Sequence, residues 1–263
     1  MPNYESAQCD VSITSRNPNK MAGLKDAVRV RLNKDPSMKI STYFSNLKWL
    51  VITFPLLFRR VDNWSRVFLY CLQPLHKGPL TIRFRNRDVL IVPKWYIFEG
   101  VAETLLQNVY HFDESLDNVV VDIGASIGDF TLFASRPKNV RVYSYDPDQT
   151  TFPYLQQNVA ANRRATVRMF NRPASADSLQ EIFQLYGEAE VDLLKIDCEG
   201  CEYELLFKCP STLLSRVRKI SMEIHPVKGR SKEELVRLLQ GAGFSTSQAK
   251  EFGQGPYIYA WRD

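Results

Sequence analysis

The sequence has few cysteines and no long apolar run. Its five cysteines are an odd number, which does not suit the disulfide framework of a small secreted domain. The N-terminus shows no positive stretch followed by an apolar segment and a cleavage site, so we expect a reducing, cytoplasmic setting. The longest apolar run, Trp49 to Phe58, covers about ten residues, whereas a helix that crosses a bilayer needs about 20. The sequence therefore predicts no transmembrane segment.

A continuous basic stripe is also missing. The net charge is +5, but the basic residues are scattered, and the absence of a stripe argues against a nucleic-acid partner. The small basic clusters are Arg59-Arg60, Arg83-Arg85-Arg87 and Arg163-Arg164. The apolar block from Trp49 to Arg60 could rest on a membrane surface, and a helix packed on the catalytic domain explains the same pattern. Peripheral membrane contact therefore stays open.

The 263 residues suggest one catalytic domain with an N-terminal extension. Residues 1–20 are polar and predict a flexible terminus. Residues 21–117 predict short helices, a hairpin formed by 80–85 and 88–92 around Asn86-Arg87, and a helix over about 95–109. Residues 118–263 predict the catalytic domain.

The catalytic domain shows short β-rich runs, most of them followed by a helical pattern. The runs are Val119–Ile123, Val140–Asp146, Thr166–Phe170, Val191–Asp197 and Lys219–His225. This alternation predicts an α/β fold with parallel strands covered on both faces. Ser178 with Glu181 and Ser231 with Glu234 fit capping boxes, and Gly187 and Gly241 stand where C-terminal caps belong. Residues 244–248 and 257–261 predict a final hairpin.

A glycine turn after the first of these strands is the strongest functional signal. A dinucleotide fingerprint would place glycines at positions one, three and six of the turn, and here only Gly124 fits. The spacing is Asp122-x-Gly124-x-x-x-Gly128, which is typical of the first motif of methyltransferases. S-adenosylmethionine (SAM) is therefore favoured over a nicotinamide cofactor. We expect Ala125 and Ser126, inside the turn, to contact the same ligand.

Two acidic groups follow neighbouring strands. Asp146, before Pro147, ends the second strand and could accept hydrogen bonds from both ribose hydroxyls; capping of the next helix is the alternative. Lys195, Asp197 and Glu199 alternate at the end of the fourth strand, so they point to one side. Charges on a buried strand are costly unless they are paired or functional, which favours a functional cluster.

Together these motifs resemble the FkbM family of SAM-dependent methyltransferases from about Glu99 to the C-terminus. The resemblance rests on Asp-Ile-Gly-Ala-x-x-Gly, the Asp-Pro after strand two, Ser178-Leu179, Leu-Lys-Ile-Asp-x-Glu-Gly-x-Glu and Met-Glu-Ile-His. It implies a class I Rossmann-like fold with a seven-stranded, mostly parallel sheet whose last strand is antiparallel. It also implies SAM as cofactor and O-methylation of a hydroxyl on a sugar, polyketide or other small, glycan-linked or lipid-linked acceptor.

The resemblance assigns roles residue by residue. Asp122, Gly124 and Gly128 would hold the methionine end of SAM, and Asp146 the ribose. The residues implied to border the acceptor are Lys195, Asp197, Glu199, Glu223 and His225. Two departures stand out: only Asn171 to Asp177 separate the third strand from the Ser-Leu helix, which suggests a reduced adenine pocket around Arg172 to Ala176, and cysteines occupy the usually apolar positions 198 and 201. We interpret both cysteines as packing residues, not as a redox pair or half of a zinc site.

An alcohol needs a base within hydrogen-bond reach to become a good nucleophile. Our hypothesis is that Asp197 or Glu199 orients the acceptor hydroxyl, with His225 or Lys195 taking part in proton transfer. No metal is assigned, although Asp197, Glu199 and Glu223 could gather a divalent ion. The rival hypotheses are a non-catalytic SAM-binding partner or sensor, a nucleic-acid methyltransferase and an amine acceptor. The acceptor's identity and the oligomeric state have no readable signal.

Overall fold

The computed structural model describes residues 54–72, 78–93, 104, 107–250 and 256–262. These residues all fall within one compact unit, Trp49–Asp263. The flexible terminus expected over 1–20 and residues 95–103, 105 and 106 of the helix expected over 95–109 lie outside the described residues. The end of that helix was predicted wrongly, because residues 107–109 are not helical and Asn108 has a left-handed φ of 54°. The boundary expected between residues 117 and 118 stays a prediction. In the part of the chain that the structure describes, no helix is long and apolar enough to cross a bilayer.

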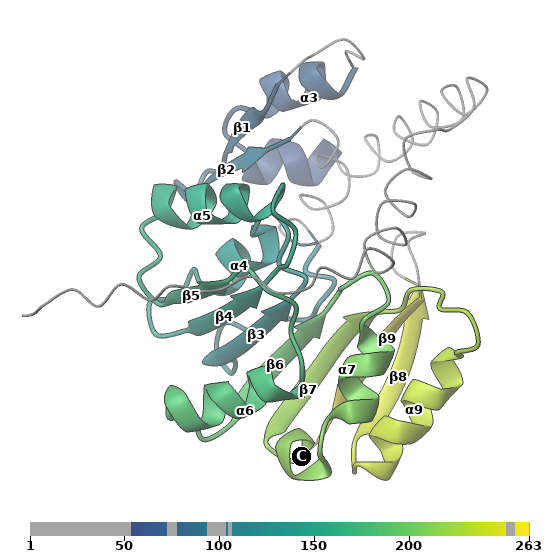
Figure 1. Ribbon diagram of the computed structural model, residues 1–263. Helices are drawn as coiled ribbons and strands as arrows, with labels where there is room; N and C mark the ends of the chain where they lie inside the picture. Colours follow the sequence, from purple (N-terminus) through teal and green to yellow (C-terminus); the bar gives the residue numbers. More distant parts are fainter. Residues whose placement is uncertain (1–53, 73–77, 94–103, 105–106, 251–255, 263) are drawn as a thin grey trace, which may run out of the picture. The chain divides into compact units, whose positions relative to one another are not determined.

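A seven-stranded sheet forms the centre of this unit, in the order β5-β4-β3-β6-β7-β9-β8 (Figure 1). Its strands are β3 (Val119–Ile123), β4 (Arg141–Tyr145), β5 (Val167–Phe170), β6 (Val191–Ile196), β7 (Val217–Glu223), β8 (Ser245–Lys250) and β9 (Pro256–Trp261). The first five strands in this spatial order, β5, β4, β3, β6 and β7, pair in parallel, and β9 is antiparallel to both β7 and β8. The α/β fold, the seven strands and the antiparallel last strand are as expected.

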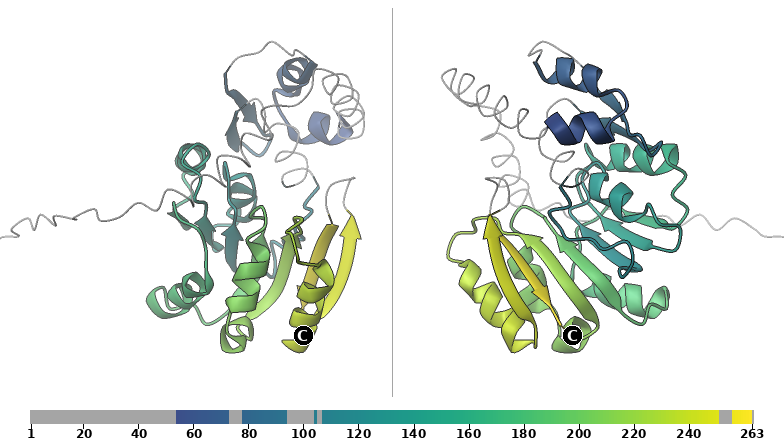
Figure 2. Two further views of the ribbon diagram at one scale, coloured as in Figure 1. Left: turned by 45° about the vertical axis from the view of Figure 1, so that its right-hand side comes forward. Right: turned by 180° about the vertical axis from the view of Figure 1, so that it is seen from behind.

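The central strands are apolar on both faces because helices cover both sides. All five residues of β3 are buried. One core joins alternate residues of β3 and β6 to α4 (Asp129–Ala134) and the N-terminal segment, for example Val120, Leu193 and Phe130. The other core contains Val121 and Leu194. It is covered by α6 (Ala176–Leu185), α7 (Glu202–Lys208), α8 (Ser211–Leu214) and α9 (Lys232–Gly241), and α6, α7 and α9 lie on the same face of the sheet (Figures 1 and 2).

The predicted N-terminal hairpin is present. Strands β1 (Leu80–Arg83) and β2 (Val89–Val92) pair antiparallel, and Arg87 turns the chain with a positive φ of 73°. The segment 54–60 is helical, and α3 (Trp64–Leu72) follows. Buried Leu57, Val61 and Ile82 belong to the same core as Val120 of the sheet. The hairpin is therefore packed into the catalytic core.

Two asparagines replace a neighbouring strand along β2. On α5 (Phe152–Ala161), the Asn158 side chain accepts from Ile91 N and donates to Ile91 O. Asn162, one turn later, does the same with the backbone of Val89. An amide can donate and accept at once, so it satisfies both backbone groups of an unpaired strand edge. This contact ties the hairpin to the second crossover helix.

Helix ends show where the capping signals were read correctly. Ser231 is the N-cap of α9, and Gly187 follows the C-cap of α6 with φ 70°, as expected. The capping box expected between Ser231 and Glu234 is not formed, since α9 has no side-chain cap hydrogen bond. Ser178 is not an N-cap: α6 begins earlier, with Ser175 as N-cap and Ser178 completing the capping box from the N3 position. Gly241 is the last residue of α9, and the left-handed position is Gly243, with φ 89°. The errors at Ser178 and Gly241 have the same cause: a second serine or glycine stands nearby, and the sequence pattern does not show which of the two is the cap.

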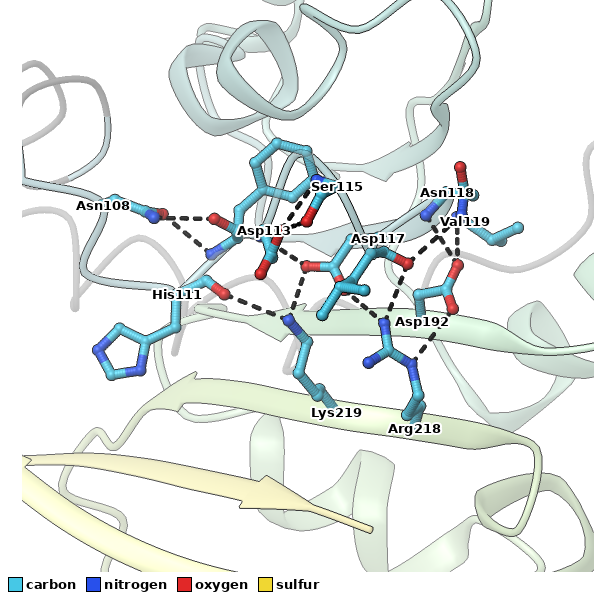
Figure 3. A network of polar contacts seen from close by, with 12 residues as sticks. Asn108, His111, Asp113, Ser115, Asp117, Asn118, Val119, Asp192, Arg218 and Lys219 are labelled. Atoms are coloured by element: carbon cyan, nitrogen blue, oxygen red, sulfur yellow. Dashed lines mark hydrogen bonds and ion pairs between the residues drawn. The ribbon is translucent and has the colours of Figure 1, made fainter. Parts of the chain in front are cut away.

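A charged network holds the segment before β3 against the amino ends of the strands (Figure 3). The fully buried Asp117 carboxylate accepts from Asp113 N and pairs with Arg218 and Lys219, each at 2.7 Å. Asp192 of β6 accepts from the backbone N–H groups of Asn118 and Val119, each at 2.8 Å. Acids and bases alternate, so each carboxylate has partners of opposite charge or polarity.

Candidate functional site

The predicted site residues meet at the carboxyl ends of the strands. The strand order reverses between β3 and β6, because the chain passes from β3 to β4 on one side and returns to β6 on the other. In open α/β sheets ligands bind at such a switch point, outside the carboxyl ends. The loops that follow β3, β4, β6 and β7 supply the expected residues around this point (Figure 1).

The glycine turn is wedged between the ends of β4 and β6. The N–H groups of Gly124 and Ala125 both donate to Tyr145 O, and Gly124 has a φ of 78°. A Cβ atom at Gly124 would overlap the carbonyl oxygen of Asp197. Gly124 is therefore required for two reasons, its left-handed backbone and the close approach of the loop after β6.

Asp146 ties the end of β4 to that turn. Its carboxylate accepts from Ser126 N at 2.6 Å and from Asp148 N at 2.8 Å, with the Thr151 hydroxyl at 3.3 Å. Burial raises the pKa of Asp146, although these backbone hydrogen bonds act in the opposite direction. Asp146 does not cap the next helix, the alternative considered from the sequence, because α5 has Thr151 as its N-cap and no side-chain cap hydrogen bond. Each carboxylate oxygen has two lone pairs, so Asp146 can accept further hydrogen bonds. The contact with the ribose stays a prediction, and so does any role of the exposed Pro147.

Lys195 and Asp122 form a buried ion pair beneath the turn. Lys195 Nζ lies 3.0 Å from Asp122 and donates to Gly124 O at 2.8 Å. Asp122 is fully buried and also accepts from the Thr131 hydroxyl. Burial alone would lower the pKa of Lys195, but Asp122, Asp197 and Asp129 outweigh it and raise that pKa. Lys195 therefore remains an ammonium ion, and the hypothesis that it takes up a proton is not supported.

Asp197 has a partner that the sequence did not reveal. The Tyr110 hydroxyl donates to Asp197 Oδ2 at 2.8 Å, and Lys195 Nζ lies 3.7 Å from the same oxygen. Burial, followed by the charge of Asp197, raises the pKa of Tyr110 well above its usual value, so the phenol keeps its proton. Tyr110 stands 87 positions before Asp197, and no local motif links the two.

Glu223 and His225, at the end of β7, lie beside Asp197. Burial, reinforced by the charge of Asp197, raises the pKa of Glu223 to about 7. Burial lowers the pKa of His225, but a hydrogen bond to Glu202 and the charges of Asp197, Glu202 and Glu199 raise it to about 9. At neutral pH the histidine is therefore a cation, and Glu223 is poised between its two forms.

Glu202 is a second residue that sequence reasoning missed. Its side chain is fully buried, and it accepts from His225 N at 2.7 Å and Gly200 N at 2.9 Å. Its Oε1 lies 3.4 Å from His225 Nδ1, while His225 Nε2 lies 3.8 Å from both Asp197 and Glu199. The Glu202 carboxylate thus lies on the Nδ1 side of the imidazole ring, and Asp197 and Glu199 lie on its Nε2 side. The second Glu of the Glu-Gly-x-Glu motif was the available signal.

The carboxylates expected as an alternative metal site only partly converge. Asp197, Glu223 and His225 each offer an atom within 4.8 Å of the others. The Glu199 side chain is 65% exposed and comes near the cluster through His225. The cluster is therefore a mixed acid and imidazole group on two adjacent strands, with Lys195 supplying a further cation.

Cys198 and Cys201 are not two separate packing residues: their sulfurs are bonded to each other. Cys209 is a buried free thiol. Both cysteines pack against the core, as interpreted from the sequence, but the rejection of a redox pair was wrong, because a Cys-x-x-Cys spacing leaves the direction of the side chains undetermined. The left-handed turn at Glu199 and Gly200, with φ values of 56° and 107°, brings the two side chains together.

The strand order and the glycine turn define a class I methyltransferase fold, the fold of SAM-dependent methyltransferases. Within that class, residues 166–246 match the family model described as "Methyltransferase FkbM domain", in agreement with the resemblance seen in the motifs. The matched segment contains β6, Lys195, Asp197, Glu223 and His225.

Individual relatives are distant. tRNA (guanine(37)-N(1))-methyltransferase 1 of Phaeodactylum tricornutum is 24% identical over 160 residues, which cover 48% of this chain and 37% of the relative. The chain thus spans little more than a third of that relative's length. Precorrin-6y C5,15-methyltransferase from Geobacter metallireducens is 17% identical with a TM-score of 0.43, covering 59% of this chain and 84% of that one. TYW2 of M. jannaschii in complex with AdoMet is 15% identical with a TM-score of 0.45, covering 70% and 85%.

Proposed function

We propose that the protein is a SAM-dependent O-methyltransferase whose acceptor is a hydroxyl on a small metabolite, a sugar, or a glycan-linked or lipid-linked molecule. One observation carries the proposal. Asp197, Glu223 and His225 gather within 4.8 Å of one another, and the loop that holds Asp197 packs against the glycine turn. The arrangement places acid and base groups beside the turn proposed for the cofactor, as transfer to a hydroxyl requires.

The residues at the switch point suit SAM. When bound, SAM supplies a methyl group on a cationic sulfonium. Carboxyl groups outnumber cations here, since Asp122, Asp146, Asp197 and Glu223 accompany Lys195 and His225. An acidic surrounding favours a cationic ligand. We assign the amino-acid end of SAM to the turn, formed by Asp122, Gly124, Ala125, Ser126 and Gly128, and the ribose to Asp146 and Pro147.

For proton removal, the pKa values favour Glu223. A general base works best when its pKa lies near the working pH, and that of Glu223 is about 7. His225 is already protonated at this pH and instead stabilises the ionised carboxylates around it. We propose that Asp197, held by Tyr110 and Lys195, orients the acceptor hydroxyl and that Glu223 takes its proton. This replaces the proton-transfer role first considered for His225 or Lys195.

Two neighbouring carboxylates give a matched test of the cofactor assignment. Asp146→Asn removes the charge proposed to face the ribose, and Asp148→Asn removes a charge two positions later on the same turn. We expect calorimetry to show about tenfold or greater loss of SAM affinity for the first variant and little change for the second, since hydrogen bonds to charged groups contribute about 1.5–3 kcal/mol. Equal affinities would refute the ribose assignment, and no heat with SAM or its demethylated product for the folded wild type would refute SAM binding itself.

The acceptor is best identified by transfer of label. The protein is incubated with methyl-labelled SAM and a small-molecule extract, and the labelled product is identified by mass spectrometry. We expect a labelled hydroxyl compound. Binding of SAM without label transfer to any acceptor would favour the non-catalytic sensor instead.

Methylation of RNA is a second candidate. It is favoured by the exposed arginines of the hairpin, Arg83, Arg85 and Arg87, and by the name of the Phaeodactylum relative. A parallel incubation with total tRNA tests it: label in RNA, and none in small molecules, would replace our first proposal.

A further inference from the structure

The Cys198–Cys201 disulfide lies in the wall of the proposed methyl-transfer site. It closes the loop between β6 and α7, and both cysteines are partly exposed. Asp197 directly precedes Cys198, and a Cβ atom at Gly124 would come within 3.3 Å of Cys198 Cα. The disulfide thus begins one residue after the proposed acceptor-binding carboxylate, and the backbone of Cys198 lies against the proposed cofactor turn.

The ring closed by the disulfide contains two residues in left-handed conformations. Glu199 has a φ of 56° and Gly200 a φ of 107°. For Glu199 this conformation is unfavourable by about 1–2 kcal/mol unless the surroundings hold it. While it is held, Glu199 Oε2 lies 3.8 Å from His225 Nε2. The ring therefore keeps a carboxylate next to the imidazolium of the cluster.

The buried Glu202 carboxylate lies between the Cys198 sulfur and His225. Its Oε2 accepts from Gly200 N at 2.9 Å and lies 3.7 Å from Cys198 Sγ, while its Oε1 accepts from His225 N. A disulfide sulfur has no proton to donate, whereas a thiol does. After reduction, the Cys198 thiol can compete with Gly200 N–H for the same carboxylate oxygen.

We propose that Cys198 and Cys201 form a reversible thiol–disulfide site that controls the neighbouring methyl-transfer site. The co-reactant class is a small disulfide such as glutathione disulfide: the two cysteine thiols give up two protons and two electrons, one S–S bond forms in the protein, and two glutathione thiols are released. Excess glutathione reverses the reaction. The disulfide form holds Glu199 and the loop in place and is the active form. The control of catalysis rests on the function proposed above, whereas the redox site does not.

The redox site is tested without any assay of activity. The full-length protein is equilibrated in buffers of varied glutathione to glutathione disulfide ratio, alkylated under non-reducing conditions, and weighed by mass spectrometry. We expect Cys198 and Cys201 to gain or lose two alkyl groups together, while Cys209→Ser, the matched control, keeps this transition. The Cys198→Ser and Cys201→Ser variants should lose it. Wild-type protein that stays fully reduced in excess glutathione disulfide, or fully oxidised in excess glutathione, would overturn the proposal.

The coupling to the site is tested by binding and transfer in the two redox states. We expect reduction to weaken SAM binding or slow methyl transfer by about five- to thirtyfold, which is the size expected when one left-handed residue is released. Cys198→Ser should behave like the reduced protein in either buffer, and Cys209→Ser should respond like wild type. Equal SAM affinity and equal transfer in both states would overturn the coupling. Absence of SAM binding in both states would instead refute the proposed function and leave the alkylation result standing.

Discussion

The two ends of the central sheet each carry a cluster of acidic and basic side chains, and the balance of acid and base differs between them. At the amino ends, Asp117 is fully buried between Arg218 and Lys219 (Figure 3). At the carboxyl ends, Asp197 and Glu223 lie beside Lys195 and His225. The first cluster fastens a segment to the sheet. The second cluster contains more carboxylate groups than the nearby cations can neutralise.

The imbalance appears in the pKa values of the carboxyl-end cluster. Glu223 is raised to about 7, with burial as the main cause and Asp197 next, and His225 is raised to about 9 by Glu202 and its other acidic neighbours, against the effect of burial. Unusual pKa values at a cleft or strand end are typical of functional sites, whereas fully paired groups serve stability. The comparison predicts that substitutions at one end change activity and those at the other change stability.

The largest effect is expected for Asp197→Asn. The amide cannot orient an acceptor hydroxyl as the carboxylate does, so methyl transfer should fall about 10²- to 10⁴-fold, the range for loss of a positioned acid–base group. SAM affinity should stay within a few-fold of wild type, as calorimetry would show. Retained turnover would remove Asp197 from the mechanism.

Asp117→Asn is the matched change at the other end. It leaves Arg218 and Lys219 without their buried partner, so we expect a loss of about 2–4 kcal/mol in the free energy of unfolding, measured with urea. Activity per folded molecule should not change. A normal stability, or a selective loss of methyl transfer, would break the comparison.

Glu223→Gln tests the assignment of the base. In the wild type, kcat should rise with pH and level off above about 7, because Glu223 must lose its proton to act as a base. The variant should be about 10²-fold slower and lose this rise. Glu190 is exposed, and Glu190→Gln serves as the control that should keep the wild-type dependence of kcat on pH. If Glu223→Gln also kept that dependence, Glu223 would be excluded as the base.

His225→Gln should alter how stability depends on pH. The folded pKa of about 9 lies above the ordinary 6.5, so His225 stabilises the fold fully below pH 6.5, and this contribution is lost as the pH rises to about 9. We expect the wild type to lose about 1–3 kcal/mol between pH 7 and 9, a range that includes only the upper half of the Glu223 titration. Urea unfolding at both pH values should show a smaller loss in the variant.

The smallest effect is expected from a chelator. Lys195 and His225 already place positive charge within 3.7 and 3.8 Å of Asp197, so methyl transfer should be unchanged by EDTA. Loss of transfer that a divalent ion restores would assign a metal to Asp197, Glu223 and His225.

Much of the fold could be predicted because its signals are local. The strands β3 to β7 are short apolar runs that need no distant partner to be recognised, and the final hairpin is marked by its own turn. The glycine turn is likewise a matter of spacing. Contacts of Tyr110 with Asp197, and of Asn158 with β2, join residues 87 and 67 positions apart, and no sequence period reports such pairs.

By itself, the sequence determined the order of elements, the glycine turn and which charged residues stand at the ends of strands, because these depend on periodicity and on backbone preferences of individual residues. Only the tertiary structure decided which charges are paired, that Lys195 stays protonated while Glu223 titrates near pH 7, and that Cys198 bonds to Cys201. Those properties depend on burial and on distances between loops from different strands, and neither exists until the sheet has formed.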